Sequence, residues 1–128
     1  IMALGKIKAD TLEHSTAGSL DTQYVVKGSA KAWIHFNGTG TVAIKDSLNI
    51  ASLSDAGTGL YNCAISSDFS NANFSTTGAA GENDDSGGNR SLGLRAKTSG
   101  TQNVRGFRDG VSADDMVEMC FQCMGDLA

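Results

Sequence analysis

The sequence of 128 residues has no proline, few basic residues, and no apolar run near the ~18 residues of a membrane-spanning helix. We therefore expect no membrane insertion. Ten Lys and Arg oppose fourteen Asp and Glu, and the basic residues form no stripe along the chain. Because phosphate neutralisation needs clustered basic side chains, we also expect no nucleic-acid partner.

Cysteine is scarce, and Cys120 and Cys123 form the sequence's one C-x-x-C. A zinc site usually takes its four ligands from two such pairs, or from one pair and two histidines. If residues 116–124 form a strand, these two side chains point to opposite faces and cannot chelate one ion together. We therefore expect packed free thiols, including Cys63, with no metal ion and no cofactor. A zinc or redox C-x-x-C is the alternative.

Histidine is scarcer still, because His14 and His35 are the only two and lie in unrelated contexts. A nucleophilic triad needs a histidine base beside a Ser or Cys and a carboxylate, and no G-x-S-x-G motif occurs. Asp84 and Asp85 are adjacent in a glycine-rich stretch, which is a poor way to hold two carboxyls at the fixed separation of a glycosidase. We expect no catalytic residue and interpret the protein as non-enzymatic.

Glycine is abundant, with 16 residues placed between short runs that alternate apolar and polar side chains. Alternation with a period of two predicts strands, and glycine reaches the positive φ that tight turns need. Ala32, Ile34 and Phe36 are expected to share one strand face, with Trp33 on the other. We predict an all-β fold, a small antiparallel β-sandwich. Its expected strands are residues 30–36, 41–45, 60–66, 71–77, 90–98, 102–109 and 116–124.

The last predicted strand, residues 116–124, can also be interpreted as part of a helix. Apolar residues from Val117 to Cys123 alternate with polar ones, as in a strand with two faces. A helix over residues 112–124 is the alternative, with Ser112 as N-cap and Asp115 completing a capping box. We favour the strand, because the alternation is clean and the surrounding pattern is β.

Residues 78–89 are predicted to form a loop, because they contain four glycines, three acidic residues and no large apolar side chain. The carboxylates suggest a hard cation, which needs about six oxygen ligands, but their order matches neither an EF-hand nor a calcium β-roll. We interpret the stretch as a solvated loop. Its candidate contacts with a receptor or partner are Glu82, Asp84, Asp85 and Asn89.

Trp33 is the sole tryptophan and is expected to lie on the strand face opposite Ala32 and Ile34. There it could stack on a sugar ring, or fill a subunit interface or the second layer of the sandwich. We favour packing and keep Trp33 as a candidate contact residue.

Residues 1–27 differ in composition from the β-sandwich domain predicted at 28–128. Their apolar residues are too sparse to bury much surface within the segment. Residues 8–14 are expected to form a helical turn or two. The segment is either a flexible tail or an extended arm that becomes ordered against partner subunits. Its candidate docking or oligomerisation residues are Leu4, Ile7 and Leu12.

Three strings lie close together in the chain: KAWIHFNGTGT at 31–41, DSLN at 46–49 and DAGTGLY at 55–61. Together they resemble a module of bacteriophage tail fibres and related virion proteins, with a K-A-W-x-x-F-N-G-T-G-T core, a D-S-x-N segment and a D-x-G-T-G-x-Y hairpin. The resemblance covers roughly residues 20 to 75. It indicates a structural role and no particular chemistry.

The resemblance implies a tail fibre or fibre-like appendage that works as a homotrimer. The N-terminal arm would then dock to tail, neck or baseplate proteins, and the β domain would present its loops for host attachment, with a host surface glycan as one candidate receptor. It implies a location in the virion after assembly in the cytoplasm of the bacterial host. A capsid decoration protein and a carbohydrate-binding module are the alternatives.

Overall fold

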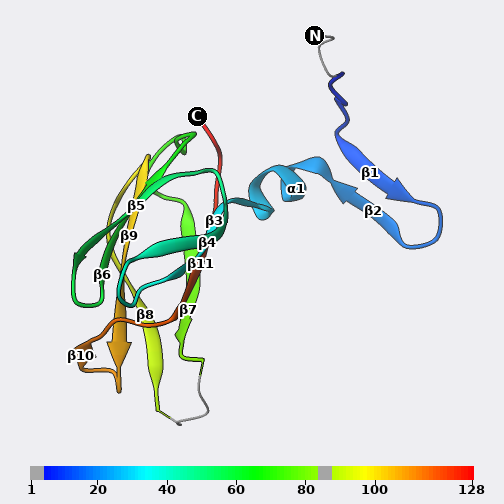
Figure 1. Cartoon of the computed structure of the whole chain (residues 1–128). Coiled ribbons are helices and arrows are strands. Elements are labelled where there is room, and N and C mark those ends of the chain that lie inside the picture. The colour runs from blue at the N-terminus through cyan, green and yellow to red at the C-terminus, as the bar shows by residue number, and fades with distance from the viewer. Residues whose placement is uncertain (1–4, 84–87) are drawn as a thin grey trace.

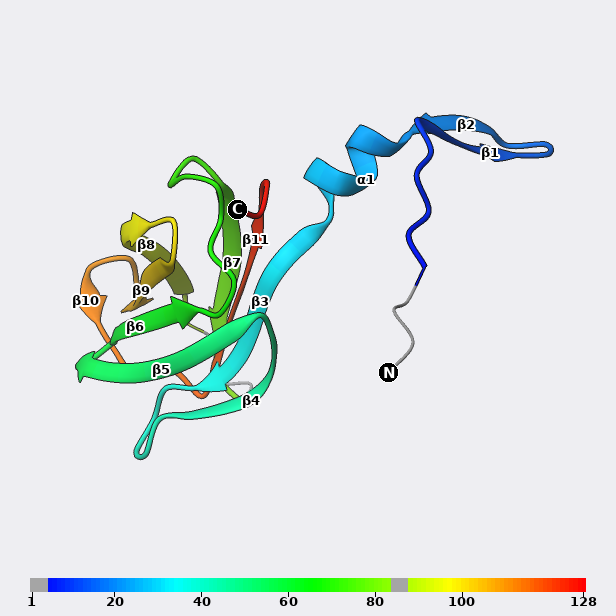
Figure 2. The same ribbon diagram turned by 90° about the horizontal axis from the view of Figure 1, so that it is seen from above.

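The computed structural model describes residues 5–83 and 88–128 and has two antiparallel sheets that face each other as a sandwich (Figures 1 and 2). Sheet 1 has four strands in the order β4-β3-β11-β7, which are β3 (Ala30–Asn37), β4 (Ala43–Leu48), β7 (Ser75–Gly81) and β11 (Glu118–Met124). Sheet 2 has the order β10-β9-β6-β5, with β8 also paired to β9; its strands are β5 (Ile50–Gly57), β6 (Leu60–Ile65), β8 (Arg90–Thr98), β9 (Thr101–Arg108) and β10 (Ser112–Ala113). The predicted all-β, antiparallel sandwich is confirmed.

The centre of sheet 1 consists of the two most regularly alternating segments of the chain. In β3 and β11 alternate side chains are buried, and Phe121 lies opposite Ile34 in their antiparallel ladder. The side chains between the buried ones point to the outer surface of the sheet. The strand interpretation of the C-terminal region is therefore confirmed, and the rival helix over residues 112–124 is wrong.

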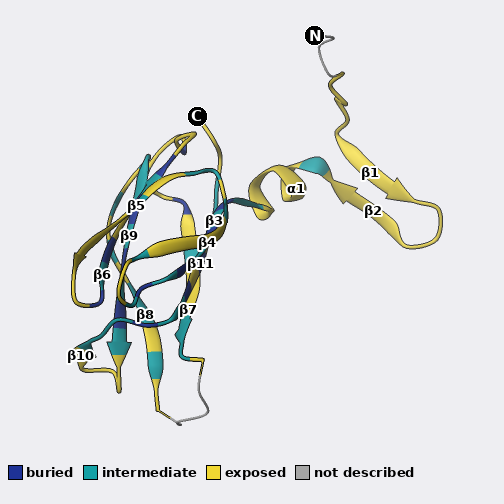
Figure 3. Cartoon of the chain, in the orientation of Figure 1, coloured by how far each residue is buried: buried dark blue, intermediate teal, exposed yellow. Residues whose placement is uncertain are grey.

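The core lies between the two sheets and contains thirteen buried apolar residues (Figure 3). Phe36 of sheet 1 meets Tyr61 of sheet 2 edge-on, with ring centroids 5.0 Å apart. Gln102 is fully buried in the same interior, and its Oε1 accepts a hydrogen bond of 2.8 Å from Thr76 Oγ1. Because Gln102 belongs to sheet 2 and Thr76 to sheet 1, this bond joins the sheets through a buried polar group whose oxygen is satisfied.

Two glycines and the tyrosine of the phage-like strings meet at one end of the core. The Tyr61 hydroxyl lies 3.0 Å from the Gly38 carbonyl and 2.9 Å from Asp115 Oδ1, which also accepts a 2.6 Å hydrogen bond from Gly59 N. A Cβ on Gly38 would lie 2.3 Å from the Tyr61 hydroxyl, and one on Gly59 would lie 2.7 Å from Asp114 N. Gly59 also has φ +68. Both positions therefore require glycine.

Polar residues of the same strings shape turns. Asn37 Oδ1 accepts a 3.1 Å hydrogen bond from Thr39 N directly after β3. Asn49 has φ +58 and carries the chain from β4 in sheet 1 to β5 in sheet 2. Its side-chain amide exchanges hydrogen bonds of 2.7 and 3.1 Å with the main chain of Ser67. These asparagines act locally on the backbone, as turn residues do.

Strand β7 is displaced from its prediction, since it spans Ser75–Gly81 rather than residues 71–77. The predicted loop at residues 78–89 therefore begins with four strand residues. Pairing with β11 explains the difference, because Gly78 lies opposite Phe121 and a Cβ there would come within 2.8 Å of the Phe121 Cβ. The small residues that suggested a loop are those that fit this close ladder.

Strands β4 and β5 show two further differences. Strand β4 spans Ala43–Leu48 rather than residues 41–45. Strand β5 at Ile50–Gly57 was not predicted, because most of its side chains are exposed and polar or small and give no alternation. It pairs with β6, and its partly buried Ile50 and Leu53, three residues apart rather than two, pack against the core.

Residues 5–29 lie to one side of the sandwich in both views (Figures 1 and 2). Strands β1 (Thr11–His14) and β2 (Gly18–Asp21) form a two-stranded hairpin, and helix α1 (Thr22–Gly28) leads from it towards β3. The helical turn predicted within residues 8–14 is wrong. Gly18, with φ +95, lets the chain reverse, so that Leu12 pairs with Leu20.

Candidate binding surfaces

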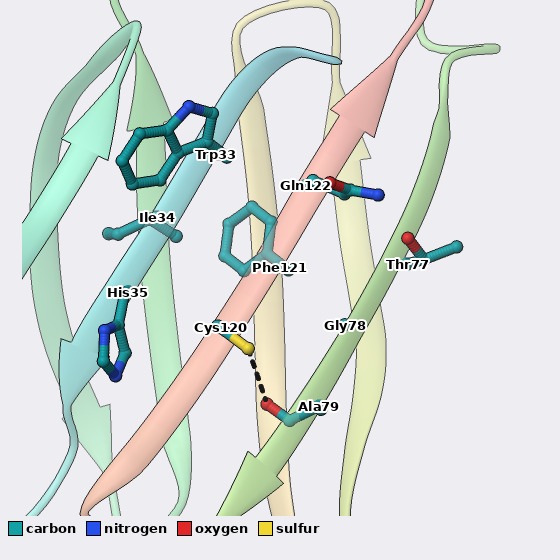
Figure 4. A pocket seen from close by; sticks show the side chains of 9 residues that line it. All are labelled: Trp33, Ile34, His35, Thr77, Gly78, Ala79, Cys120, Phe121 and Gln122. Atoms are coloured by element: carbon teal, nitrogen blue, oxygen red, sulfur yellow. Dashed lines mark hydrogen bonds between the residues drawn. The ribbon is translucent and has the colours of Figure 1, made fainter. Parts of the chain in front are cut away.

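A shallow groove of about 420 Å³ lies on the outer face of sheet 1, across β3, β11 and β7 (Figure 4). These strands are far apart in sequence and are brought together by the ladders of β11 with β3 and with β7. Most of the groove's surface is apolar. Its lining residues are Trp33, Ile34, His35, Thr77, Gly78, Ala79, Cys120, Phe121 and Gln122.

Trp33 is half-buried at one side of this groove and extends from the same side of β3 as His35 (Figure 4). It lies between Leu48 of β4 and Gln122 of β11 in the sheet register. Leu48 is 49% exposed, so an indole and an aliphatic side chain lie side by side on the outer surface. The predicted orientation of Trp33, away from the core, is confirmed.

Next to Trp33, the outer face of sheet 1 carries a cluster of charged side chains. Glu118 forms an ion pair with Lys45 and a hydrogen bond with His35 Nε2. Hydrogen bonds from Lys45 and then from His35 hold the pKa of Glu118 below its ordinary value. The carboxylate is therefore ionised at neutral pH and already engaged by two partners. The cluster anchors β4 to β11 across β3, and nothing in it resembles a nucleophile with a free base.

The two cysteines of the C-x-x-C point to opposite faces, as predicted. Cys123 is buried with Cys63 in the core, as expected of packed thiols. Cys120 is exposed in the groove, and its Sγ lies 3.7 Å from the Ala79 carbonyl oxygen, so the expectation of a packed thiol is wrong for this residue, which lies on the outer face of β11. Burial raises the pKa of Cys63 to about 12 and also raises that of Cys123. These two groups remain protonated thiols at neutral pH, a form that is a poor nucleophile and metal ligand.

The acidic-loop candidates have different surroundings. Glu82 Oε1 lies 3.6 Å from Arg90 Nε and 3.8 Å from an Arg108 Nη, and its side chain is only 18% exposed. Asn89 is exposed, and its main-chain N–H donates to Asp109 Oδ1 at 3.2 Å. The other two candidates, Asp84 and Asp85, lie outside the described residues.

The N-terminal candidates belong to a larger set of exposed apolar side chains. Ile7 is 94% exposed and Leu12 49% exposed, while Leu4 lies outside the described residues. Sequence reasoning missed Leu20, because its pairing with Leu12 depends on the unpredicted hairpin. The remaining exposed apolar residues of this segment are Tyr24, Val25 and Val26 of α1.

Sequence reasoning also missed the groove and the Glu118 cluster. A signal was present, because Cys120 and Gln122 alternate with the buried residues of β11 and so must face outward. What the sequence does not contain is the neighbour order β3-β11-β7, which places these residues beside Trp33.

Within residues 5–83 and 88–128, no three His, Cys, Asp or Glu side chains are grouped so that they could hold a metal ion. Over the same ranges, no helix is long and apolar enough to cross a membrane. A scan against protein-family models, a search of curated proteins and a search of solved structures each found no match to this chain.

Proposed function

We propose that this chain is a non-enzymatic structural component of a phage virion, a tail fibre or fibre-like appendage that works as a homotrimer. Residues 5–29 serve assembly and attachment to other tail, neck or baseplate proteins. The sandwich presents its outer surface and loops for host attachment. Three copies in one assembly strengthen contacts that are weak for a single domain. In this proposal the protein is assembled in the bacterial cytoplasm and resides in the virion.

The observation that carries the proposal is the uncovered apolar surface of residues 5–29. Ile7, Leu12, Leu20, Tyr24, Val25 and Val26 are 42–94% exposed, and α1 has no buried residue. Soluble monomers seldom leave large contiguous apolar patches uncovered, and such patches mark interaction sites. A segment that packs against other chains would cover these side chains.

The positions that carry the resemblance to phage fibres support a structural role in a second way. Gly38, Gly59 and Tyr61 serve close packing at one end of the core, and Asn37 and Asn49 serve turns. None of these five side chains lines the groove around Trp33. These five positions therefore build the sandwich, whereas Trp33 of the same strings lines the groove.

The test is the mass of the purified chain in solution, measured by light scattering. We expect a mass near three times the 13.2 kDa of one chain. A chain lacking residues 2–27, measured alongside, tells whether the sandwich associates without the N-terminal segment. A well-folded monomer at 13.2 kDa would contradict the fibre proposal.

A carbohydrate-binding module is the second candidate function, and the groove around Trp33 favours it. The half-buried indole of Trp33, beside the amide of Gln122 and the imidazole of His35, offers an aromatic surface and hydrogen-bonding groups to a sugar. Calorimetric titration of the chain with bacterial surface polysaccharides tests this. Binding that is lost in Trp33→Ala but kept in Tyr24→Ala would support it.

A further inference from the structure

We infer that residues 5–29 form a self-association surface, in which the Leu12–Leu20 side of the hairpin and the apolar side chains of α1 pack against the same segment of a second copy of the chain. This inference rests on the proposed function and names the partner of its assembly segment. We call the hairpin side that carries Leu12 and Leu20 the leucine face.

The hairpin is amphipathic in its cross-strand pairs. Leu12 and Leu20 are directly paired, so their side chains lie together on one face, where they are 49% and 46% exposed. Successive residues of a strand point to opposite faces, so the neighbouring pairs lie on the other side. Those neighbouring pairs are Thr11–Asp21 and Glu13–Ser19. The fourth pair, His14–Gly18, shares the leucine face, so the apolar part of that face is Leu12 with Leu20, and the opposite face is polar.

Neither element of the segment has a stabilising core of its own. A two-stranded hairpin is at best marginally stable in water, and an isolated helix needs roughly 12–15 residues. Helix α1 has seven residues, and Tyr24, Val25 and Val26 are 42–63% exposed. Packing of these apolar side chains against another surface would supply the missing stability.

A second copy fits this surface by charge. The carboxylates of Glu13 and Asp21 lie on the face away from the leucines, so contact between two leucine faces does not bring those like charges together. Because α1 leads towards β3, joined segments would hold the sandwiches side by side.

The experiment compares two matched double variants by light scattering over a dilution series. Leu12→Thr with Leu20→Thr changes the apolar cross-strand pair, and Glu13→Thr with Ser19→Thr changes the adjacent polar pair. Threonine favours strands, so the hairpin propensity is kept in both. We expect the leucine variant to dissociate at a concentration more than about tenfold higher than wild type, since two buried leucines are lost. The polar variant should dissociate at a concentration within about twofold of the wild-type value.

Cross-linking supplies a second readout that does not depend on stability. In a Cys120→Ser background, Leu12→Cys should give cross-linked dimers with a short bis-maleimide, and Ser19→Cys on the opposite face should not. Cys63 and Cys123 are buried and remain unlabelled in the folded chain. Circular dichroism checks that each variant keeps the sandwich.

The outcomes separate the inference from the proposed function. If wild type is a trimer and the leucine variant is an equally tight trimer, the inference is overturned and the fibre proposal stands, with the segment docking to another virion protein. Equal cross-linking at residues 12 and 19 also overturns it. If wild type is a monomer at every concentration, both fail.

Discussion

Residues 5–29 and residues 30–128 differ in whether their large apolar side chains form a buried core. The sandwich places thirteen apolar side chains between two sheets, including Phe36 and Tyr61, which are completely buried. The N-terminal segment has regular secondary structure as well, but its large apolar side chains are exposed. The sandwich therefore has a core of its own, and the N-terminal segment has none.

The difference shows that secondary structure and stability have separate origins in this molecule. In the sandwich, ladders and core support each other, as where Phe121 pairs with Ile34 and both are buried. In the hairpin, the ladder between Leu12 and Leu20 exists without a core beneath it. Changes in the two regions should therefore affect different measurements, namely unfolding of the sandwich and association of copies.

The largest contrast is expected from truncating one aromatic side chain in each region. Phe36→Ala removes a fully buried ring and should lower the free energy of unfolding by about 3–5 kcal/mol. Tyr24→Ala, at a position 63% exposed, should change it by less than about 0.5 kcal/mol. Urea denaturation followed by circular dichroism measures both, at a concentration where association is constant. Equal effects of the two changes would contradict the conclusion that the buried core belongs to the sandwich and not to the N-terminal segment.

A smaller contrast is expected from two glycines with positive φ. In Gly59→Ala the new Cβ would lie 2.7 Å from Asp114 N, and the backbone would keep the strained φ of +68. We therefore expect the free energy of unfolding to fall by more than about 2 kcal/mol. Gly18 has φ +95, but a Cβ at this position would meet nothing within 4 Å, so Gly18→Ala should strain only the hairpin. Thermal unfolding of the sandwich should then shift for residue 59 and stay unchanged for residue 18.

Alkaline pH should destabilise the sandwich through its buried thiol. Burial raises the pKa of Cys63 from 9.0 to about 12, so the folded state favours the protonated form. This contribution to stability is complete below pH 9 and is lost as the pH rises from 9 towards 12. The slope of unfolding free energy against pH should be reduced in Cys63→Ala. A chain lacking residues 5–29, which contain no cysteine, should keep the wild-type slope.

The smallest effect is expected at the surface of sheet 1. The pKa of Glu118 is lowered by Lys45 and His35, so these contacts stabilise the fold above the ordinary value of 4.5 and are lost as the pH falls through the lowered pKa. Glu118→Gln should cost less than about 1 kcal/mol at neutral pH, as exposed ion pairs do. The difference from wild type should shrink in acid and at high salt. A difference that persists in both would mean that Glu118 acts through packing.

Strands could be predicted from the sequence where buried positions and period-two alternation of apolar residues coincide. Strands β3 and β11 were recognised because alternate residues are apolar and those residues form the core. In β9, Val104 and Gly106 face inward. In β8, a register shift between Leu94 and Lys97 interrupts the ladder, and Leu94 is 51% exposed although it follows Leu92 by two residues.

Prediction failed where the apolar pattern along a strand is weak. Strands β5 and β7 carry small or polar side chains, and their positions follow from their neighbours in each sheet. Helix α1 contains the β-branched pair Val25 and Val26, which disfavour a helix slightly. The groove around Trp33 was beyond sequence reasoning because it depends on three strands that are distant in the chain.

The position of Trp33 gives the protein an optical probe on its own surface. A lone tryptophan buried in a core reports folding through its emission. Here the single indole is instead half-buried on the outer face of sheet 1 and lines the groove. Its emission maximum and its quenching by acrylamide should therefore respond when another molecule covers that face, even though the core does not change. Leu48 and Gln122 flank the indole, so substitutions there would tune the signal without altering the fold.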